Sequence, residues 1–210
     1  DYTQLTRAFE KFTNLPIVID NSVKGTAMAN IDFQKVKDPN RYNIAFLQYG
    51  DNFNFVVTNL NDPIVSYDNR TNFVDNIIVD PNSDEECPCG RRGCAKSELS
   101  PAALIKKAKR VFDKEKAPYL YAITDGNPDN IVYEMIIDSV ANGDPAIKEM
   151  YRRSAELMAV LMNNLIFSTN PQKLVMHDFR ISDSDFYTFK SILERIGGKD
   201  ISELIDLSII

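Results

Sequence analysis

The stretch Cys87-Pro88-Cys89-Gly90-Arg91-Arg92-Gly93-Cys94 brings three thiols within eight residues, and these are all the cysteines of the chain. Its glycines and proline allow a tight turn, and thiolates are soft ligands suited to zinc. The spacing therefore predicts a metal-binding knuckle. The alternative is a glycine-rich turn that carries free thiols. Tetrahedral zinc also needs a fourth ligand, which the stretch itself does not supply.

The composition is that of an ordinary globular protein. With 210 residues, 44% of them hydrophobic and 26% charged, the chain can form one domain with a proper core or two small ones. Its net charge of -6 argues against nucleic-acid binding by this segment, because such binding needs a basic face. No apolar run is long enough to span a membrane, and no signal peptide is visible. The odd, clustered cysteine count favours a reducing cytoplasm and a metal over disulfides.

Hydrophobic spacing predicts mainly strands in the first half of the chain. Two apolar runs separated by Gly50-Asp51-Asn52 indicate a hairpin, within an antiparallel meander of three or four strands that leads to the cysteines. The expected strands are 17–19, 43–49, 53–59, 64–67 and 76–79, with helices at 3–12 and 23–28.

The second half reads as helical. Ser100-Pro101 supplies a helix cap and a proline suited to the first turn, and Pro145 begins the longest expected helix. The second half of that helix carries few charges and is expected to be buried on nearly every side. The expected helices are 101–116, 130–141, 146–169 and 185–196, with strands at 174–176 and 205–210. Strands followed by helices and a final βα return indicate an α/β or α+β layer fold.

The cysteine stretch, followed by Ser100, resembles the C-x-C-G-x-x-G-C signature of the ROK (repressor, open reading frame, kinase) family of bacterial sugar kinases and sugar-responsive regulators. Residues 15–27 resemble the family's segment around its Asn-Asp pair, and 142–176 resemble the closing part of its fold. The resemblance implies the C-terminal lobe of a ribonuclease H-like, actin-like sugar-kinase fold. We expect residues 1–210 to form a single such lobe of a longer protein, without the upstream lobe and winged helix-turn-helix.

The residues that the resemblance assigns to catalysis and sugar binding have changed. Where the family has the catalytic base, Asn21 is followed by Ser22, and a serine hydroxyl has no useful basicity near neutral pH. Residues 72–76 match the family's G-E-x-G-H segment, so Asn76 stands at the histidine position. Lys96 stands where the resemblance places a second sugar-binding glutamate. We therefore expect no kinase activity.

The same resemblance makes the histidine the fourth zinc ligand, so zinc at Cys87, Cys89 and Cys94 is expected to have an incomplete ligand set. Water or one of the acidic residues Asp80, Asp84, Glu85 and Glu86 could complete it. The family's glycine-rich phosphate loop is Gly50-Asp51-Asn52-Phe53-Asn54 here, and its later Gly-Gly pair is His177-Asp178. Phosphates need close approach to backbone amides, which glycines allow. Most of these glycines are absent here, so ATP is not expected to bind. We expect His177 to be an ordinary surface or capping residue.

These features favour the effector-sensing and oligomerising domain of a cytoplasmic, dimeric ROK-type transcriptional regulator. The ligand would be a sugar or sugar derivative held by Asn21, Ser22, Lys24, Asn76 and Lys96, and DNA contact would fall to the upstream domain. The alternatives are a kinase-fold scaffold for dimerisation or partner binding, and a sugar kinase that uses unusual residues.

Overall fold

The structure, a computed structural model, describes residues 2–13, 15, 43–58, 73–179, 183–203 and 205–207. Helices and strands there follow in the order α1 (Tyr2–Phe9), β1 (Ile44–Gln48), β2 (Asn54–Thr58), η2 (Phe73–Asn76), α3 (Ala95–Leu99), α4 (Pro101–Val111), α5 (Pro118–Ile123), η3 (Pro128–Asn130), α6 (Tyr133–Ala141), α7 (Pro145–Thr169), β3 (Lys173–His177), α8 (Asp183–Gly197), α9 (Lys199–Glu203) and β4 (Ile205–Leu207). The two short elements η2 and η3 are 3-10 helices.

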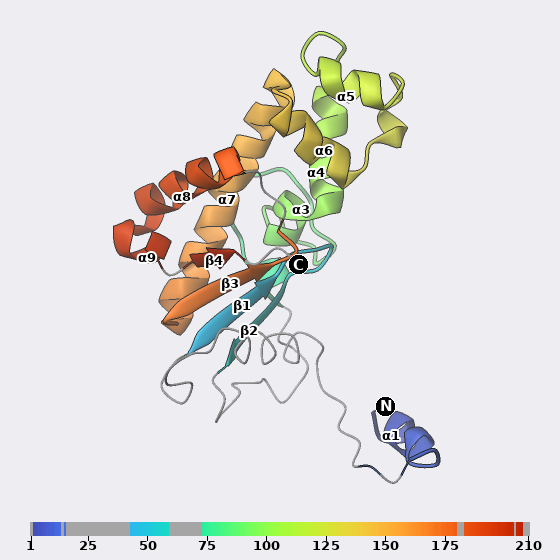
Figure 1. The fold of residues 1–210 in the computed structure, drawn as a ribbon, viewed down its shortest axis with the longest axis vertical. Coiled ribbons are helices and arrows are strands. Elements are labelled where there is room, and N and C mark those ends of the chain that lie inside the picture. The colour runs from blue at the N-terminus through green and yellow to red at the C-terminus, as the bar shows by residue number, and fades with distance from the viewer. Residues whose placement is uncertain are drawn as a thin grey trace.

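A four-stranded mixed sheet in the order β2-β1-β3-β4 forms one layer, and α7 runs along it (Figure 1). β1 pairs antiparallel with β2, and Phe46 lies opposite Val56. β1 also pairs in parallel with β3, which comes more than a hundred residues later, and β3 pairs in parallel with β4. α4, α5 and α6 lie toward the N-terminal end of α7, α3 lies nearer the sheet, and α8 and α9 lie on the other side of α7 (Figure 1).

Local signals account for where the main helices begin and end. The hydroxyl oxygen of Ser100 accepts a hydrogen bond from the backbone N–H of Ala103, and Pro101 fills the first turn of α4. Pro145 begins α7 in the same way. At the other end of α7, Asn170 adopts a left-handed conformation (φ 43°), which stops the helix and turns the chain toward β3.

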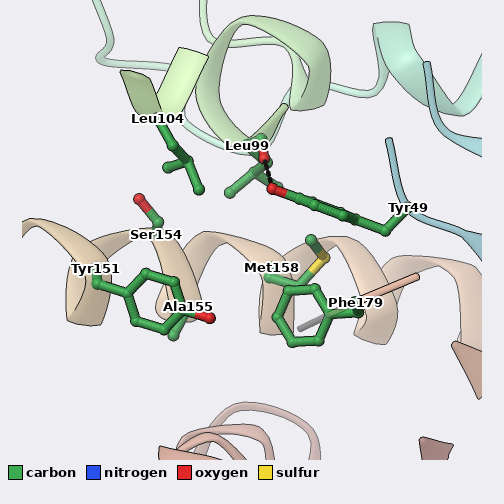
Figure 2. A pocket seen from close by; sticks show the side chains of 8 residues that line it. All are labelled: Tyr49, Leu99, Leu104, Tyr151, Ser154, Ala155, Met158 and Phe179. Carbon is green, nitrogen blue, oxygen red and sulfur yellow. Dashed lines mark hydrogen bonds between the residues drawn. The ribbon is translucent and has the colours of Figure 1, made fainter. Parts of the chain in front are cut away.

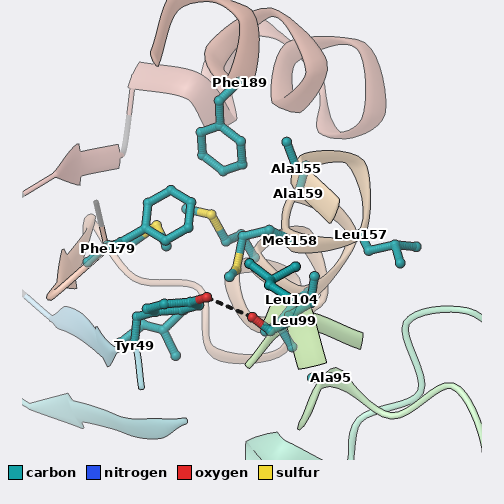
Figure 3. Close-up of a cluster of buried hydrophobic side chains, with 14 of the residues drawn as sticks. Tyr49, Ala95, Leu99, Leu104, Ala155, Leu157, Met158, Ala159, Phe179 and Phe189 are labelled. Atoms are coloured by element: carbon teal, nitrogen blue, oxygen red, sulfur yellow. Dashed lines mark hydrogen bonds between the residues drawn. The ribbon is translucent and has the colours of Figure 1, made fainter. Parts of the chain in front are cut away.

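The core lies between the sheet and α7 (Figure 3). Met158 and Ala159 of α7 meet Leu99 and Tyr49, while Phe179 and Phe189 close the cluster from the C-terminal side (Figure 3). From residue 157 to 162 only Val160 is not buried, so this part of α7 is enclosed almost all round. The prediction of burial is wrong for the last turns of the helix, where Asn164, Phe167 and Ser168 are exposed. None of the helices in the described parts of the chain is both long and apolar enough to cross a membrane.

The predicted α/β fold is confirmed, but one strand and the antiparallel meander are wrong, and the short helices α3, α5 and α9 were not predicted. The hairpin of β1 and β2 around Gly50 is present. The strand expected at 76–79 is wrong: 73–76 form η2, and Ile78 makes only an isolated bridge to Cys94. The sheet also continues through parallel pairing with β3, not through a longer antiparallel meander. The elements expected at 17–19, 23–28 and 64–67 fall outside the described residues.

Candidate functional site

The three cysteine sulfurs converge. The Sγ atoms of Cys87, Cys89 and Cys94 all lie within 4.8 Å of one another, and those of Cys89 and Cys94 are 3.6 Å apart. Backbone hydrogen bonds close the turn: the N–H of Cys87 donates to the carbonyl of Arg91 (2.8 Å), and that of Gly90 donates to the carbonyl of Cys87 (2.9 Å). Cys87 and Cys94 are buried, whereas Cys89 is exposed. The predicted clustering of the thiols is therefore present.

Gly93 sits at the point where the cysteine turn crosses residue 80. Its φ is +67°, and a Cβ there would lie 1.8 Å from the carbonyl oxygen of Asp80. Only glycine avoids both the strained conformation and the clash. The N–H groups of Val79 and Asp80 both donate to the carbonyl of Gly93, at 2.8 and 3.2 Å. This close backbone crossing sets the position of Cys94.

The environments of the exposed and buried thiols differ. A hydrogen bond with the Arg91 side chain lowers the pKa of Cys89 to about 6. Burial instead raises the pKa of Cys94 to about 12. Thiolates are stabilised by nearby cations and destabilised by burial without a partner. The cluster thus combines one readily ionised sulfur with one that needs a further cation to ionise.

The donor set fits zinc. With zinc–sulfur bonds of about 2.3 Å, tetrahedral geometry puts two sulfurs about 3.8 Å apart, close to the spacing of Cys89 and Cys94. The three thiolates of Cys87, Cys89 and Cys94 would hold the metal, and the metal would supply the charge that lets buried Cys94 ionise. Such a metal would hold the segment together, in the way that structural zinc sites do.

Ion pairs hold the residues that lead into the cysteine segment on the helices α4 and α7. Glu85 pairs with Arg110 and with Lys106 of α4, the latter at 2.9 Å, and Asp80 pairs with Arg153 of α7 at 2.8 Å. The hydrogen bond from Arg110, with Lys106 adding to it, lowers the pKa of Glu85 to about 2. Side-chain ion pairs therefore hold Asp80 and Glu85 on α7 and α4, and backbone hydrogen bonds join this stretch to Gly93.

A second polar cluster lies at the loop between β1 and β2. The backbone N–H of Phe53 donates to Oδ1 of buried Asp75 (2.6 Å). Nζ of Lys96 donates to Oδ1 of Asn52 (2.5 Å) and lies 3.8 Å from Oδ2 of Asp75. Burial raises the pKa of Asp75, and the Phe53 amide and Lys96 oppose that rise. The loop is thereby fastened to η2 by the carboxylate of Asp75 and to α3 by the ammonium group of Lys96.

His177 and Asp178 occupy the end of β3. Asp178 has a left-handed backbone (φ 62°), a conformation that glycine adopts without cost and most other residues avoid. Its carboxylate lies 2.9 Å from Nδ1 of His177 and accepts a hydrogen bond from Nε2 of Gln48 (3.1 Å). Residue 178 thus has a backbone conformation suited to glycine, but its side chain is a carboxylate.

An apolar cavity in the core is not a ligand site (Figure 2). Its volume is about 10 Å³, room for about one water molecule. The hydroxyl of Tyr49 points across it and donates to the carbonyl of Leu99 (2.8 Å), and burial raises the pKa of Tyr49. The lining residues are Tyr49, Leu99, Leu104, Tyr151, Ser154, Ala155, Met158 and Phe179 (Figure 2).

The residues proposed to bind a ligand divide into two groups. Asn21, Ser22 and Lys24 lie outside the described residues. Asn76 and Lys96 are described and lie near different features. Oδ1 of Asn76 lies 3.9 Å from Sγ of Cys87, whereas Lys96 belongs to the loop cluster. Sequence reasoning missed the pairing of Asp75 with the loop, although an acidic residue in the segment matched to G-E-x-G-H was a visible signal.

Comparisons with known proteins agree with this architecture. The fold matches a ROK family glucokinase from Streptomyces griseus, solved with glucose and AMPPNP, at a TM-score of 0.67 and 20% identity, covering 95% of this chain and 70% of the other. It matches a ROK hexokinase from Thermus thermophilus at a TM-score of 0.71 and 14% identity, covering 98% and 65%. It also matches a ROK family transcriptional regulator, a homolog of the E. coli MLC protein, at a TM-score of 0.67 and 21% identity, covering 98% and 50%.

The fold is thus the actin-like ATPase fold of the ROK sugar kinases, and the chain spans between half and 70% of the length of these three structures. The ROK family model matches residues 71–196, which include the cysteine segment and α3 to α8. The chain therefore belongs to the ROK family. No curated protein matches the sequence.

Proposed function

We propose that this lobe is the effector-sensing and oligomerising part of a ROK transcriptional regulator and that it does not phosphorylate a sugar. ROK structures that resemble it include both kinases and a regulator, so the family alone leaves both functions open. The choice between them therefore depends on the residues of the site.

The observation that carries the proposal is the hydrogen bond from the Phe53 N–H to Asp75 (2.6 Å). Phosphate-binding loops work by presenting free backbone amides to the anion. Here an amide of the matched loop already donates to an internal carboxylate. A nucleotide phosphate would have to displace that carboxylate and would approach Asp51 on the same loop. Both effects oppose ATP binding.

Lys96 supports the loss of kinase chemistry from the sugar side. It stands where the resemblance places a sugar-binding glutamate, and it replaces an acceptor by a donor with the opposite charge. Its ammonium group already contacts Asn52 and Asp75. A ligand that entered here would meet a cation, which favours a sugar derivative with an acidic group over a neutral sugar.

The remaining parts of the proposal follow from charge and family. The acidic net charge of the chain makes DNA contact the task of another part of the protein. Ligand binding would act on that part by shifting the arrangement of a homodimer in the cytoplasm. Asn21, Ser22 and Lys24 would contribute to the same ligand site from the segment that resembles the family's Asn-Asp pair.

Isothermal titration of the full-length protein tests the proposal. Hexoses, hexose phosphates and sugar acids are titrated without ATP, and magnesium-AMPPNP is titrated separately. We expect saturable binding of one sugar-derived compound and no binding of the nucleotide. ATP-dependent turnover of a hexose would make the protein a kinase and overturn the proposal. No binding across the whole panel would overturn the sensing role and favour the scaffold.

A pair of charge-reversal variants localises the ligand. Lys96→Glu should weaken binding of an acidic effector at least about 10-fold, because it turns an attractive contact into a repulsive one. Lys114→Glu makes the same charge change at an exposed position after α4 and should leave affinity unchanged. Equal affinities for the two variants would place the effector away from Lys96.

A further inference from the structure

A neutral amide, that of Asn76, lies near the fourth position around the three sulfurs. Among the described residues, the cysteines are joined by no histidine or carboxylate within metal-binding distance of all three. The side-chain oxygen of Asn76 lies beside them, 3.9 Å from Sγ of Cys87. In a tetrahedral zinc site, a sulfur and an oxygen ligand lie about 3.6 Å apart. The oxygen of Asn76 is therefore at nearly that distance from one of the three sulfurs.

The acidic residues that the sequence offered for this position are engaged elsewhere. Asp80 pairs with Arg153 and Glu85 with Arg110 and Lys106. Asp84 and Glu86 are exposed and pair with Arg92, at 3.5 and 3.1 Å. Moving any of them to the sulfurs would break an ion pair. None of these four carboxylates joins the three sulfurs in the structure, and Asn76 and solvent lie beside Cys87.

We propose that Cys87, Cys89 and Cys94 form a three-thiolate metal site with an exchangeable fourth position. The neutral amide oxygen of Asn76 is a much weaker zinc ligand than imidazole, thiolate or carboxylate. Zinc sites with four strong protein ligands are closed, whereas sites with three accept an external ligand. Solvent reaches this site because Cys89, Gly90 and Arg91 are exposed. Imidazole or a small thiolate can therefore enter it.

The inference is independent of the function proposed above, because it concerns the cysteine segment and not the loop cluster. It also makes a structural prediction about one substitution. The Nδ1 atom of histidine and the Oδ1 atom of asparagine are each bonded to Cγ, so histidine at position 76 would bring a nitrogen to the same place. Asn76→His should therefore convert the open site into a closed one.

Cobalt(II) substitution of the full-length protein provides the first test and needs no variant. Cobalt bound by three thiolates gives intense sulfur-to-metal absorption and visible bands that report its coordination. We expect millimolar imidazole to shift the visible bands of the wild-type protein and to leave the sulfur absorption in place. Absence of cobalt binding, or bands that ignore imidazole, would overturn the open site.

Zinc affinity provides the second test, through competition with a chromophoric chelator. Asn76→His should bind zinc at least 10-fold more tightly than wild type, by analogy with the roughly 10–100-fold effects of weaker changes around metal sites. Its cobalt bands should no longer respond to imidazole. Asn164→His, at an exposed position of α7, is the matched control and should behave as wild type. Equal zinc affinities for wild type and a folded Asn76→His protein would contradict the proposal.

Discussion

The loop of residues 50–54 and the cysteine segment of residues 87–94 have diverged from the family pattern in opposite ways. The loop keeps its place between β1 and β2, but its amide and side chains now bond to Asp75 and Lys96. The cysteine segment keeps its three thiols together and lacks only the histidine expected at position 76. The amide and side chains of the first region make internal contacts, whereas the second region holds three thiols close together.

The difference shows what holds each region in place. Backbone amides of a loop can donate to any nearby oxygen acceptor, so the carboxylate of Asp75 can hold the loop of residues 50–54 without a bound phosphate. A carboxylate cannot replace a metal ion at the thiol cluster in this way. Burial raises the pKa of Cys94, so its thiolate needs a nearby cation. The two regions should therefore respond differently to substitution.

The largest expected effect is that of Cys94→Ser. It removes a fully buried ligand and leaves a hydroxyl in its place, so zinc affinity should fall at least about 100-fold and stability by about 2 kcal/mol. Cys89→Ser, at an exposed position, should lose zinc affinity similarly with a smaller loss of stability in the metal-free protein. Chelator competition and urea unfolding measure the two quantities. Unchanged zinc binding in both variants would show that the segment is a turn with free thiols.

Asp75→Ala should have the next largest effect. It leaves the buried N–H of Phe53 without its acceptor, which costs about 2 kcal/mol of unfolding free energy. Asp51→Ala, at an exposed position of the same loop, should change stability by less than about 0.5 kcal/mol. Urea unfolding of both variants measures the difference. If the two variants lose the same stability, the carboxylate of Asp75 does not hold the loop.

Glu85→Gln should have the smallest effect, with a distinct pH dependence. Since the folded pKa of Glu85, about 2, is below its ordinary value of 4.5, the carboxylate stabilises the fold above about pH 4.5. That contribution is lost as the pH falls toward 2. The variant should lose on the order of 1 kcal/mol at pH 7, because its partners are half exposed, and less at pH 3.

Urea unfolding at the two pH values measures this change. Glu86→Gln provides the control, since Glu86 is exposed and pairs only with Arg92 among the described residues. A loss for Glu85→Gln that is equal at pH 7 and pH 3 would mean that the ion pairs with α4 do not fasten the cysteine segment.

The fold was predictable wherever the signals are local. Ser100-Pro101 and Pro145 mark helix starts in the sequence, and both are confirmed. The strand expected at 76–79 is wrong, because short apolar runs such as Ile77-Ile78 do not by themselves distinguish a strand from a turn. The short helices α3, α5 and α9 were missed because each spans too few residues to show a helical period.

The same holds for the candidate site: contacts between residues close in sequence could be predicted, and contacts between distant residues could not. The clustering of Cys87, Cys89 and Cys94 could be predicted because the three residues lie within eight positions. The contact of Lys96 with Asn52 could not, because it joins residues 44 positions apart whose meeting depends on how α3 packs. The structural neighbours define the fold and leave the roles of these side chains to experiment.

The parallel pairing of β1 with β3 has a consequence for biosynthesis. Ile44 pairs with Lys173, so the second edge of β1 has no partner until 129 further residues have been made. At about 5–20 residues per second, the ribosome takes roughly 10 s over that interval. During this time the nascent hairpin exposes apolar side chains and unpaired backbone groups. An open strand edge of this kind associates readily with other chains. Production of the protein should therefore depend on chaperones that shield this hairpin until α7 and β3 emerge.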